Sequence, residues 1–328
     1  MKGNHIKENQ KKPEQELSRQ ETSEVKYGYI ACVGRPNVGK STLINTLVGT
    51  KISAVSPKPQ TTRRSIIGIK TIREDGKLYQ LVFIDTPGIH KPKDELGSQM
   101  VKHAIDSLKS ANVVYHLVDS SEGIQGEDID VFENLKHILG TEGLNPAVFC
   151  VLTKIDLIKK EKLLPMMEEI GKWNFYKEII PVSALKSLNL QELISYTLKY
   201  LPQESEIHFP EDTIFGLPLR ILVQEVIMEK IYNYTHMEIP YSTAVDIEEV
   251  THRGNKVIYI KATIYVERPG QKKIIIGEDG SKIKQIGTLA REELELLTGK
   301  KVYLDLWVKV RGDWRKNIHF VKKVYFSD

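Results

Sequence analysis

The chain has 328 residues, of which 41% are hydrophobic and 27% charged, and its formal net charge is +4. These values are typical of an ordinary soluble globular protein that is long enough for two domains. No apolar run approaches the roughly 20 residues of a membrane-spanning helix, and we expect no secretory signal. The cysteines, Cys32 and Cys150, both lie in apolar runs, so we expect buried, reduced thiols in a cytoplasmic protein.

Residues 1–26 are dominated by Lys, Glu, Gln and Asn, and we expect them to form a disordered polar tail. Between residues 27 and 201, apolar strand-like runs alternate with helical patterns. This alternation predicts a doubly wound α/β sheet, whose ligand loops lie at the carboxyl ends of the strands. The predicted strands span residues 27–33, 65–73, 78–84, 112–118, 147–152 and 178–182.

Residues 202–213 are interpreted as a linker, and residues 214–328 as a smaller α+β domain. We predict, in order, a helix over 214–234, strands over 242–251 and 256–266, a Gly-rich turn, a helix over 281–297 and a strand over 301–310. Basic and acidic side chains number 2 and 8 over residues 209–250, but 17 and 9 over residues 251–328. The basic end suggests a polyanionic partner, although a mixed solvated surface would give the same counts.

Residues 34–41 read G-x-x-x-x-G-K-S between a predicted strand and a predicted helix, which is the context of a phosphate-binding P-loop. The glycines let successive backbone N–H groups point at phosphate oxygens. Lys40 would reach the β- and γ-phosphates, and the Ser41 hydroxyl would bind Mg²⁺. A chance match in a glycine-bearing loop is disfavoured by this context. The nucleotide-binding residues predicted here are Gly34, Arg35, Pro36, Asn37, Val38, Gly39, Lys40, Ser41 and Thr42.

Two further segments fit a nucleoside triphosphate with Mg²⁺. Asp85-Thr86-Pro87-Gly88 follows strand 78–84, where the Asp85 carboxylate can hold Mg²⁺ and the Gly88 N–H can sense a γ-phosphate. Alone, this sequence would be a mere turn. Between the P-loop and this segment, Thr62 of Gln60-Thr61-Thr62-Arg63 is preferred over Thr61 as the residue that completes the Mg²⁺ shell. A plain polar loop is the alternative reading.

Thr153-Lys154-Ile155-Asp156 follows strand 147–152 and indicates which base is bound. Asp156 can accept hydrogen bonds from the guanine N1–H and 2-amino group, which adenine lacks, so the segment favours GTP over ATP. The stem of Lys154 would lie along the base. Thr153 stands where Asn is commoner, which predicts weaker base affinity. Ser183 and Ala184, after strand 178–182, would close over the guanine.

The four motifs, in this order, resemble the translation-factor-related class of GTPases. Within it, G-R-P-N-V-G-K-S, Q-T-T-R and D-T-P-G-I-H resemble the Era family of bacterial ribosome-assembly GTPases, and the resemblance covers nearly everything after residue 26. It implies GTP and GDP as ligands, Mg²⁺ as cofactor, and catalytic roles for Asn37, Lys40, Thr62 and Gly88.

Ile89 occupies the position where Ras-like GTPases carry a water-orienting glutamine, so we expect slow intrinsic hydrolysis. The resemblance makes Asn37 a candidate to hold K⁺ near the phosphates. The alternative, in which Asn37 only stabilises the loop turn, has about equal weight.

Residues 274–284 read I-I-I-G-E-D-G-S-K-I-K and resemble a type II KH domain. The G-x-x-G loop of such a domain clamps the backbone of about four nucleotides. Gly277 and Gly280 would allow this approach, while the Glu278-Asp279 pair departs from the family pattern and should weaken it. A ligand-free glycine turn between helices is the alternative. The cations predicted to bind RNA here are Lys273, Lys282 and Lys284.

Two tryptophans follow this loop. Trp307 is expected in the core of the last strand. Trp314 lies in a Gly-Asp-Trp-Arg segment and is predicted to stack on an RNA base, with Arg315 beside it.

The resemblance implies a monomeric GTP-driven switch that binds the 3′ region of small-subunit ribosomal RNA and assists assembly of the small ribosomal subunit. It also implies a cytoplasmic location with peripheral association at the inner face of the cell membrane. One alternative is a membrane-associated signalling GTPase whose KH-like domain binds protein or lipid. Another is a nucleotide-gated structural factor that barely hydrolyses GTP.

Overall fold

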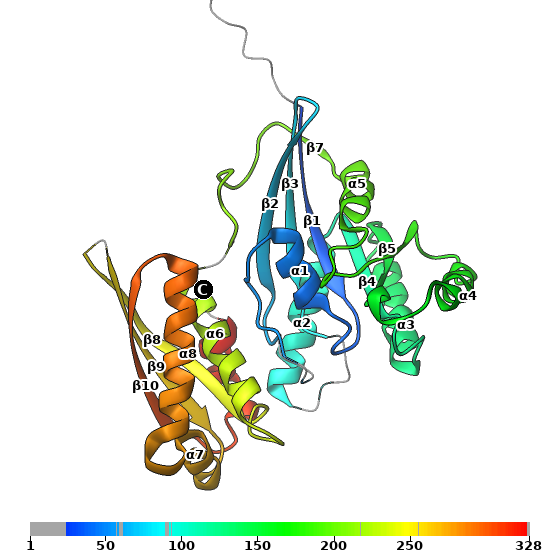
Figure 1. Ribbon diagram of the computed structural model, residues 1–328. Coiled ribbons are helices and arrows are strands. Elements are labelled where there is room, and N and C mark those ends of the chain that lie inside the picture. Colours follow the sequence, from blue (N-terminus) through cyan, green and yellow to red (C-terminus); the bar gives the residue numbers. More distant parts are fainter. Residues whose placement is uncertain are drawn as a thin grey trace, which may run out of the picture.

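The computed structural model describes residues 24–56, 58, 62–88, 92, 94–216, 218–254 and 256–326 (Figure 1). Residues 1–23 of the predicted tail, Gln60, Thr61 and Ile89 lie outside these residues. The described chain forms an N-terminal unit, residues 24–216, and a C-terminal unit, residues 218–326, each built around its own sheet.

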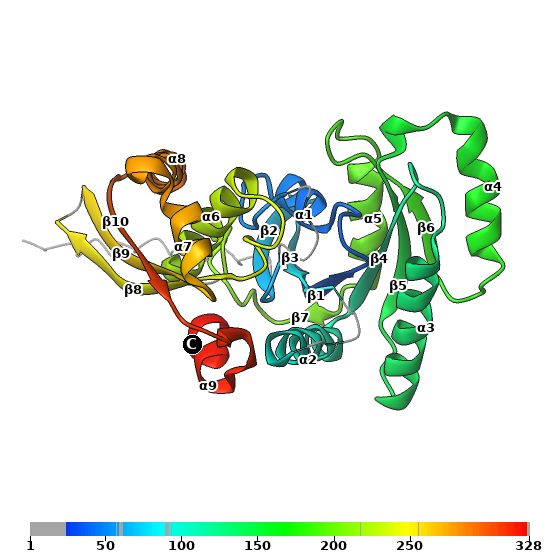
Figure 2. The ribbon, with the colours of Figure 1, turned by 90° about the horizontal axis from the view of Figure 1, so that it is seen from below.

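The N-terminal sheet has the strand order β2-β3-β1-β4-β5-β6. Strand β2 runs antiparallel to β3, and the other neighbours in this order are parallel. Helices α1 and α5 lie on one face of this sheet, and α2 and α3 lie on the other (Figure 2). Its strands are β1 (Val25–Val33), β2 (Ile66–Glu74), β3 (Lys77–Asp85), β4 (Val113–Asp119), β5 (Ala147–Thr153), β6 (Glu178–Pro181) and the short β7 (Gln203–Glu204) beside β1.

The helices of this unit are α1 (Lys40–Val48), α2 (Glu95–Ser110), α3 (Gly126–Thr141), α4 (Lys160–Gly171) and α5 (Leu190–Tyr200). Every residue of β4 and β5 is buried, because helices cover both faces of the sheet. The predicted doubly wound fold is confirmed.

The connection between the units differs from the predicted linker. Strand β7 pairs with β1, and residues 214–216 run along the edge of β2: Ile69 N donates to Ile214 O at 2.8 Å, and Gly216 N donates to Ile67 O at 3.1 Å. Helix α6 (Leu219–Tyr234) therefore begins five residues after the predicted start. Pro218 is its N-cap, and proline favours such a start because it lacks the N–H that a helix interior needs.

The C-terminal unit packs α6, α7 (Pro269–Ile276) and α8 (Ser281–Thr298) on one face of a sheet of order β10-β9-β8. The strands are β8 (Thr243–Arg253), β9 (Val257–Val266) and β10 (Lys301–Val310). Helix α7 was predicted only as a turn. Pro269 opens this helix, and the Gln271 side chain accepts the N–H groups of Glu267 and Arg268. The chain ends with η3 (Trp314–Lys316), α9 (Ile318–Val321) and η4 (Lys322–Phe326) beside α2.

Candidate nucleotide site and nucleic-acid interface

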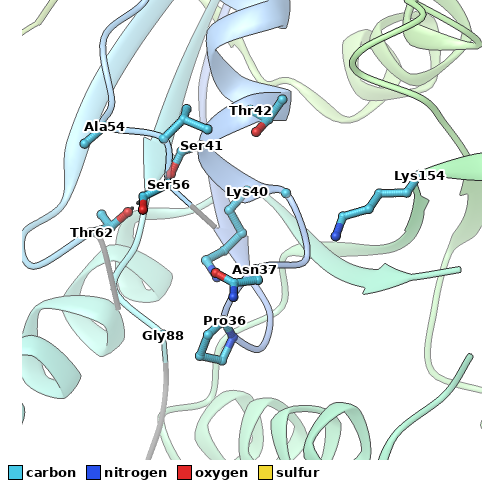
Figure 3. Close-up of a pocket in the computed structure, with 12 residues that line it drawn as sticks. Pro36, Asn37, Lys40, Ser41, Thr42, Ala54, Ser56, Thr62, Gly88 and Lys154 are labelled. Atoms are coloured by element: carbon cyan, nitrogen blue, oxygen red, sulfur yellow. Dashed lines mark hydrogen bonds between the residues drawn. The ribbon is translucent and has the colours of Figure 1, made fainter. Parts of the chain in front are cut away.

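The P-loop connects β1 to α1 and lines a cavity of about 250 Å³ (Figure 3). Asn37 and Gly39 have φ values of 65° and 98°, a left-handed conformation that turns the loop around the cavity. The buried Lys40 Nζ donates to the carbonyl oxygens of Gly34 and Arg35, both at 3.0 Å. Burial lowers the pKa of this amine, and the Asp85 carboxylate opposes the shift. The loop thus holds its lysine beside the space for phosphate.

The three predicted Mg²⁺ residues meet at one point. Asp85 Oδ2 accepts from Ser41 Oγ at 2.6 Å and from Thr62 Oγ1 at 3.3 Å. Ser53, which the sequence did not suggest, donates to the same oxygen at 2.7 Å. Burial raises the pKa of Asp85, and the bonds from Ser41 and Ser53 work against this rise.

A magnesium ion fits these donors. Asp85 Oδ1 is buried and accepts no hydrogen bond within the described part of the chain, so one carboxylate oxygen remains for a ligand. Mg²⁺ prefers oxygen ligands and keeps several waters when it binds phosphates. Ser41, Thr62 and Asp85 would hold the ion, which when bound neutralises charge on the β- and γ-phosphates.

The side chains of two residues predicted to contact the nucleotide have partners within the protein. Arg35 Nε donates to Asp128 Oδ1 at 3.1 Å, and its guanidinium also pairs with Glu122 at 2.6 Å. Thr86 Oγ1 donates to Cys32 O at 2.6 Å. These side chains fasten the loops to α3 and β1, so Arg35 and Thr86 would reach a nucleotide through their backbone. Gly88 lines the cavity.

The base-reading loops lie together because β5 and β6 are parallel neighbours. Lys154 lines the side of the cavity opposite Ser41 and Thr62 (Figure 3), and its Nζ bonds to Asp119 Oδ2 at 2.6 Å. Asp156 is half-buried in the turn that follows, and Ile155 N donates to Val182 O beside Ser183. The Ser183 hydroxyl accepts from Lys186 N, which shapes the loop that continues through Ala184.

Thr153 has a different role from the one expected of a base contact. Its Oγ1 donates to Val38 O at 2.6 Å and lies 3.2 Å from Val118 O. The hydroxyl therefore ties the P-loop to the base-reading loop.

The G-x-x-G segment forms the tight turn η2 (Glu278–Gly280) between α7 and α8. Gly277 has φ 76°, and a Cβ there would lie 2.9 Å from Lys282 N, so only glycine fits. Glu278 and Asp279 are exposed, as are Lys273 and Lys284. Beside the turn is an open groove of about 310 Å³ lined by Ile283, Lys284, Gly287, Thr288 and Arg291 of α8 and by Leu304 and Leu306 of β10. Its position beside the turn makes this groove the candidate surface for a nucleic-acid strand.

The predictions for the two C-terminal tryptophans are wrong. Trp314 is completely buried, and its Nε1 donates to Ser242 O at 2.8 Å, so it cannot stack on a base. Arg315 pairs with Asp94 at the start of α2, at 2.6 Å, and does not face the groove. Trp307 is 55% exposed rather than in the core. Successive strand residues point to opposite faces, and Trp307 alternates with the buried Val308.

The sequence also missed the residues that join the units. Arg63 is 4% exposed, and its guanidinium donates to Thr243 O at 2.6 Å and Pro240 O at 2.8 Å. It also donates to the hydroxyls of Tyr325 and Tyr232. The sequence signalled only that an arginine directly follows Thr62, the predicted Mg²⁺ ligand, because these tyrosines lie 262 and 169 positions away along the chain.

Comparisons with known proteins match both units. Residues 29–154 match the family model described as 50S ribosome-binding GTPase, and residues 238–315 match that of the KH domain. A point variant of Era from Aquifex aeolicus bound to GDP and AlF4⁻ is 45% identical, with a TM-score of 0.84; the match covers 91% of this chain and 98% of that one.

Era in complex with MgGDPNP and nucleotides 1506–1542 of 16S ribosomal RNA is also 45% identical, with a TM-score of 0.84 and coverage of 92% and 98%. The chain belongs to the Era family. The predicted resemblance, the GTPase activity and the KH fold of the C-terminal unit are therefore confirmed. The GTPase unit and the KH unit belong to one polypeptide, and each carries one of the two candidate sites.

Proposed function

We propose that this Era-family chain is a GTP-driven switch that binds the 3′ region of small-subunit ribosomal RNA and assists assembly of the small ribosomal subunit. The observation that carries this proposal is the 45% identity, over 92% of the chain, to an Era that is bound to nucleotides 1506–1542 of 16S ribosomal RNA. The G-x-x-G turn and its groove supply a matching surface here. Guanine nucleotide and Mg²⁺ would occupy the first site.

Binding to synthetic RNA tests this proposal. The full chain, loaded with a non-hydrolysable GTP analogue, should bind a single-stranded 3′-terminal segment of 16S ribosomal RNA more tightly than a scrambled segment of equal length. Contacts from Lys273, Lys282 and Lys284 to three phosphates predict a slope of about −2 for log K against log salt. Equal affinity for both RNAs would contradict the proposal, and crosslinking in the GTP and GDP states would map the nucleotides.

We also infer that K⁺ assists hydrolysis through Asn37. This residue lines the cavity in the left-handed conformation, close to Lys40 (Figure 3). A cation held there would stabilise negative charge that develops on the phosphates, which a hydrophobic Ile89 cannot do. Hydrolysis in K⁺ should exceed that in Na⁺ by at least about tenfold, and Asn37→Ala should remove the difference. Equal rates in both salts would refute this role.

The cellular location, the monomeric state and the peripheral membrane association stay predictions. No helix within the described residues is long and apolar enough to cross a membrane. Sedimentation of the purified chain with anionic vesicles, at several salt concentrations, measures direct membrane affinity. The similarity to an RNA-bound Era favours RNA over protein or lipid as the ligand of the KH unit.

A further inference from the structure

The outer face of the KH sheet carries exposed aromatic rings. Helices α6, α7 and α8 cover the inner face, where Ile258, Ile260 and Val308 are buried. The alternate residues point the other way, and among them Tyr303 is 63% exposed and Trp307 is 55% exposed. We call this surface the aromatic sheet face. It comprises Tyr259, Tyr303 and Trp307 with the flanking cations Arg253, Lys261, Lys301 and Lys309.

The rings are arranged as a platform. Tyr303 lies opposite Tyr259 in the parallel pairing of β10 with β9, and their rings stack with centroids 5.6 Å apart and planes 18° apart. The Arg253 guanidinium lies 4.4 Å from the centroid of the Tyr259 ring. Trp307 follows Tyr303 by four residues on the same face, or about 13 Å along the strand. Further along this face, Phe320 of α9 packs edge-to-face against Tyr265, with ring centroids 5.0 Å apart.

The charges on this face favour a polyanion with flat rings over an apolar partner. Along β10, the outward positions are Lys301, Tyr303, Asp305, Trp307 and Lys309, so the rings do not merge into one continuous apolar patch. The acidic groups have partners within the face: Glu248 pairs with Lys261 at 3.2 Å and with Lys309 at 3.5 Å. Asp305 accepts the Trp307 indole N–H at 3.1 Å. Glu249 of β8 lies opposite Lys261 of β9 and accepts from the Thr251 hydroxyl.

This arrangement matches single-stranded nucleic acid. Bases stack on exposed aromatic side chains, and the backbone follows cations at the margin. Lys301 and Lys309, with exposed fractions of 79% and 54%, lie at the two ends of the aromatic row on β10. Each also pairs with a carboxylate at 3.5 Å, Lys301 with Glu295 and Lys309 with Glu248.

The aromatic sheet face and the groove lie on opposite sides of the same strand, β10. Leu304 and Leu306 of β10 line the groove on the inner side, while Tyr303 and Trp307 of the same strand point outward. Strand β10 is an edge strand of its sheet, and a single strand is about 4.8 Å wide. An RNA chain that leaves the groove across this edge would arrive at the rings.

We propose that the aromatic sheet face is a second RNA contact, on which unpaired bases flanking those in the groove stack. This inference rests on the proposed RNA-binding function. It assigns to Tyr303 and Trp307 the stacking role that Trp314, being buried, cannot have.

Two synthetic single-stranded RNAs of the 16S 3′ sequence separate the surfaces: one of about 5 nucleotides, which fills the groove, and one of about 12. In the full chain, Tyr303→Ala with Trp307→Ala should weaken binding of the long RNA by about 10- to 100-fold and leave the short RNA unaffected. Tyr303→Phe with Trp307→Phe keeps the rings and should restore most of the affinity. Lys282→Ala with Lys284→Ala, beside the groove, should weaken both RNAs.

Unchanged long-RNA affinity in the double alanine variant would overturn the inference while leaving groove binding intact. Equal weakening of both RNAs would also overturn it, because the rings would then act through the fold. If the unaltered chain binds neither RNA, the proposed function itself fails. Fluorescence gives a second readout. In a Trp173→Phe variant the remaining tryptophans are the buried Trp314 and the exposed Trp307, so RNA can quench only Trp307 directly. The long RNA should quench this fluorescence and the short RNA should not, and the same result with both RNAs would contradict stacking.

Discussion

The Asp85 carboxylate accepts hydrogen bonds from three hydroxyl groups. Ser41 lies at the start of α1, Ser53 in the loop that follows α1, and Thr62 in the segment before β2. Motif spacing predicted two of these partners, because each belongs to a phosphate-binding segment with a known physical role. Ser53 lies in no motif. It reaches Asp85 because the Asn45 side chain accepts the N–H groups of Ile52 and Ser53 and so fixes the loop.

At the base-reading loop, we predict that Asp156→Asn weakens GTP binding by about 100-fold or more. The amide would replace a charged acceptor of two hydrogen bonds, each worth about 1.5–3 kcal/mol. Xanthosine triphosphate, whose base carries an oxygen in place of the 2-amino group, should recover affinity in the variant because the amide can donate to it. Titration calorimetry with each nucleotide measures both affinities in the variant and in the unaltered chain.

Asp75→Asn, in an exposed turn, is the matched control and should leave both affinities unchanged. Unaltered GTP affinity in Asp156→Asn would show that Asp156 does not read the base.

Among the elements, the predicted strands agree with the structure to within about two residues, whereas the short strand β7 and helix α7 were missed and α6 was begun too early. Buried strands are continuous apolar runs, so their ends are visible in the sequence. Helix α7 has eight residues and begins at a proline, and it depends on the side-chain cap by Gln271. Strand β10 was predicted correctly, but the face on which Trp307 lies was not, because a shift of one position exchanges the two faces.

Helix α6 carries a carboxyl that should make stability depend on pH. Glu225 is 6% exposed beneath the loop that follows α1, and burial raises its pKa to about 7. In the unfolded chain this group ionises near its ordinary value of 4.5. The folded state therefore binds more protons between these values, and the free energy of unfolding should fall as pH rises from about 4.5 to 7.

We predict that Glu225→Gln removes this decline. At pH 8 the variant should be more stable than the unaltered chain by up to about 3 kcal/mol, while at pH 5 the difference should be small. Urea unfolding at both pH values is the measurement. Glu192→Gln, at an exposed position of α5, is the control. A stability difference that is the same at pH 5 and pH 8 would rule out this ionisation.

In the whole molecule, the segment that carries the candidate Mg²⁺ ligand Thr62 also joins the two units. Thr62 faces Asp85, and the next residue, Arg63, is buried among Tyr232, Trp314 and Tyr325 of the KH unit. Val55 N donates to Glu229 Oε2 of α6 at 2.9 Å. A change in this segment on GTP hydrolysis would therefore act directly on the KH unit.

We predict that Arg63→Ala lowers the free energy of unfolding by about 2–4 kcal/mol, because buried carbonyl groups lose charged donors. The units should also separate, which small-angle X-ray scattering would detect as a larger radius of gyration. Arg63→Lys should not restore docking, since an ammonium group cannot span the same four acceptors. Arg73→Ala, which breaks an exposed pair with Glu211, should change neither quantity. Normal scattering in Arg63→Ala would refute this anchoring role.

The sequence by itself determined the two fold classes, the nucleotide class and the segments that line the candidate phosphate site. These depend on local patterns: apolar runs set strands, and motif spacing sets which backbone and side-chain groups face a ligand. Only the tertiary structure decided the burial and the bonding partners of five residues, Ser53, Arg63, Trp307, Trp314 and Arg315. Their partners lie far along the chain or on one of two strand faces, so packing, and not local sequence, determines whether each is buried, paired or free to bind RNA.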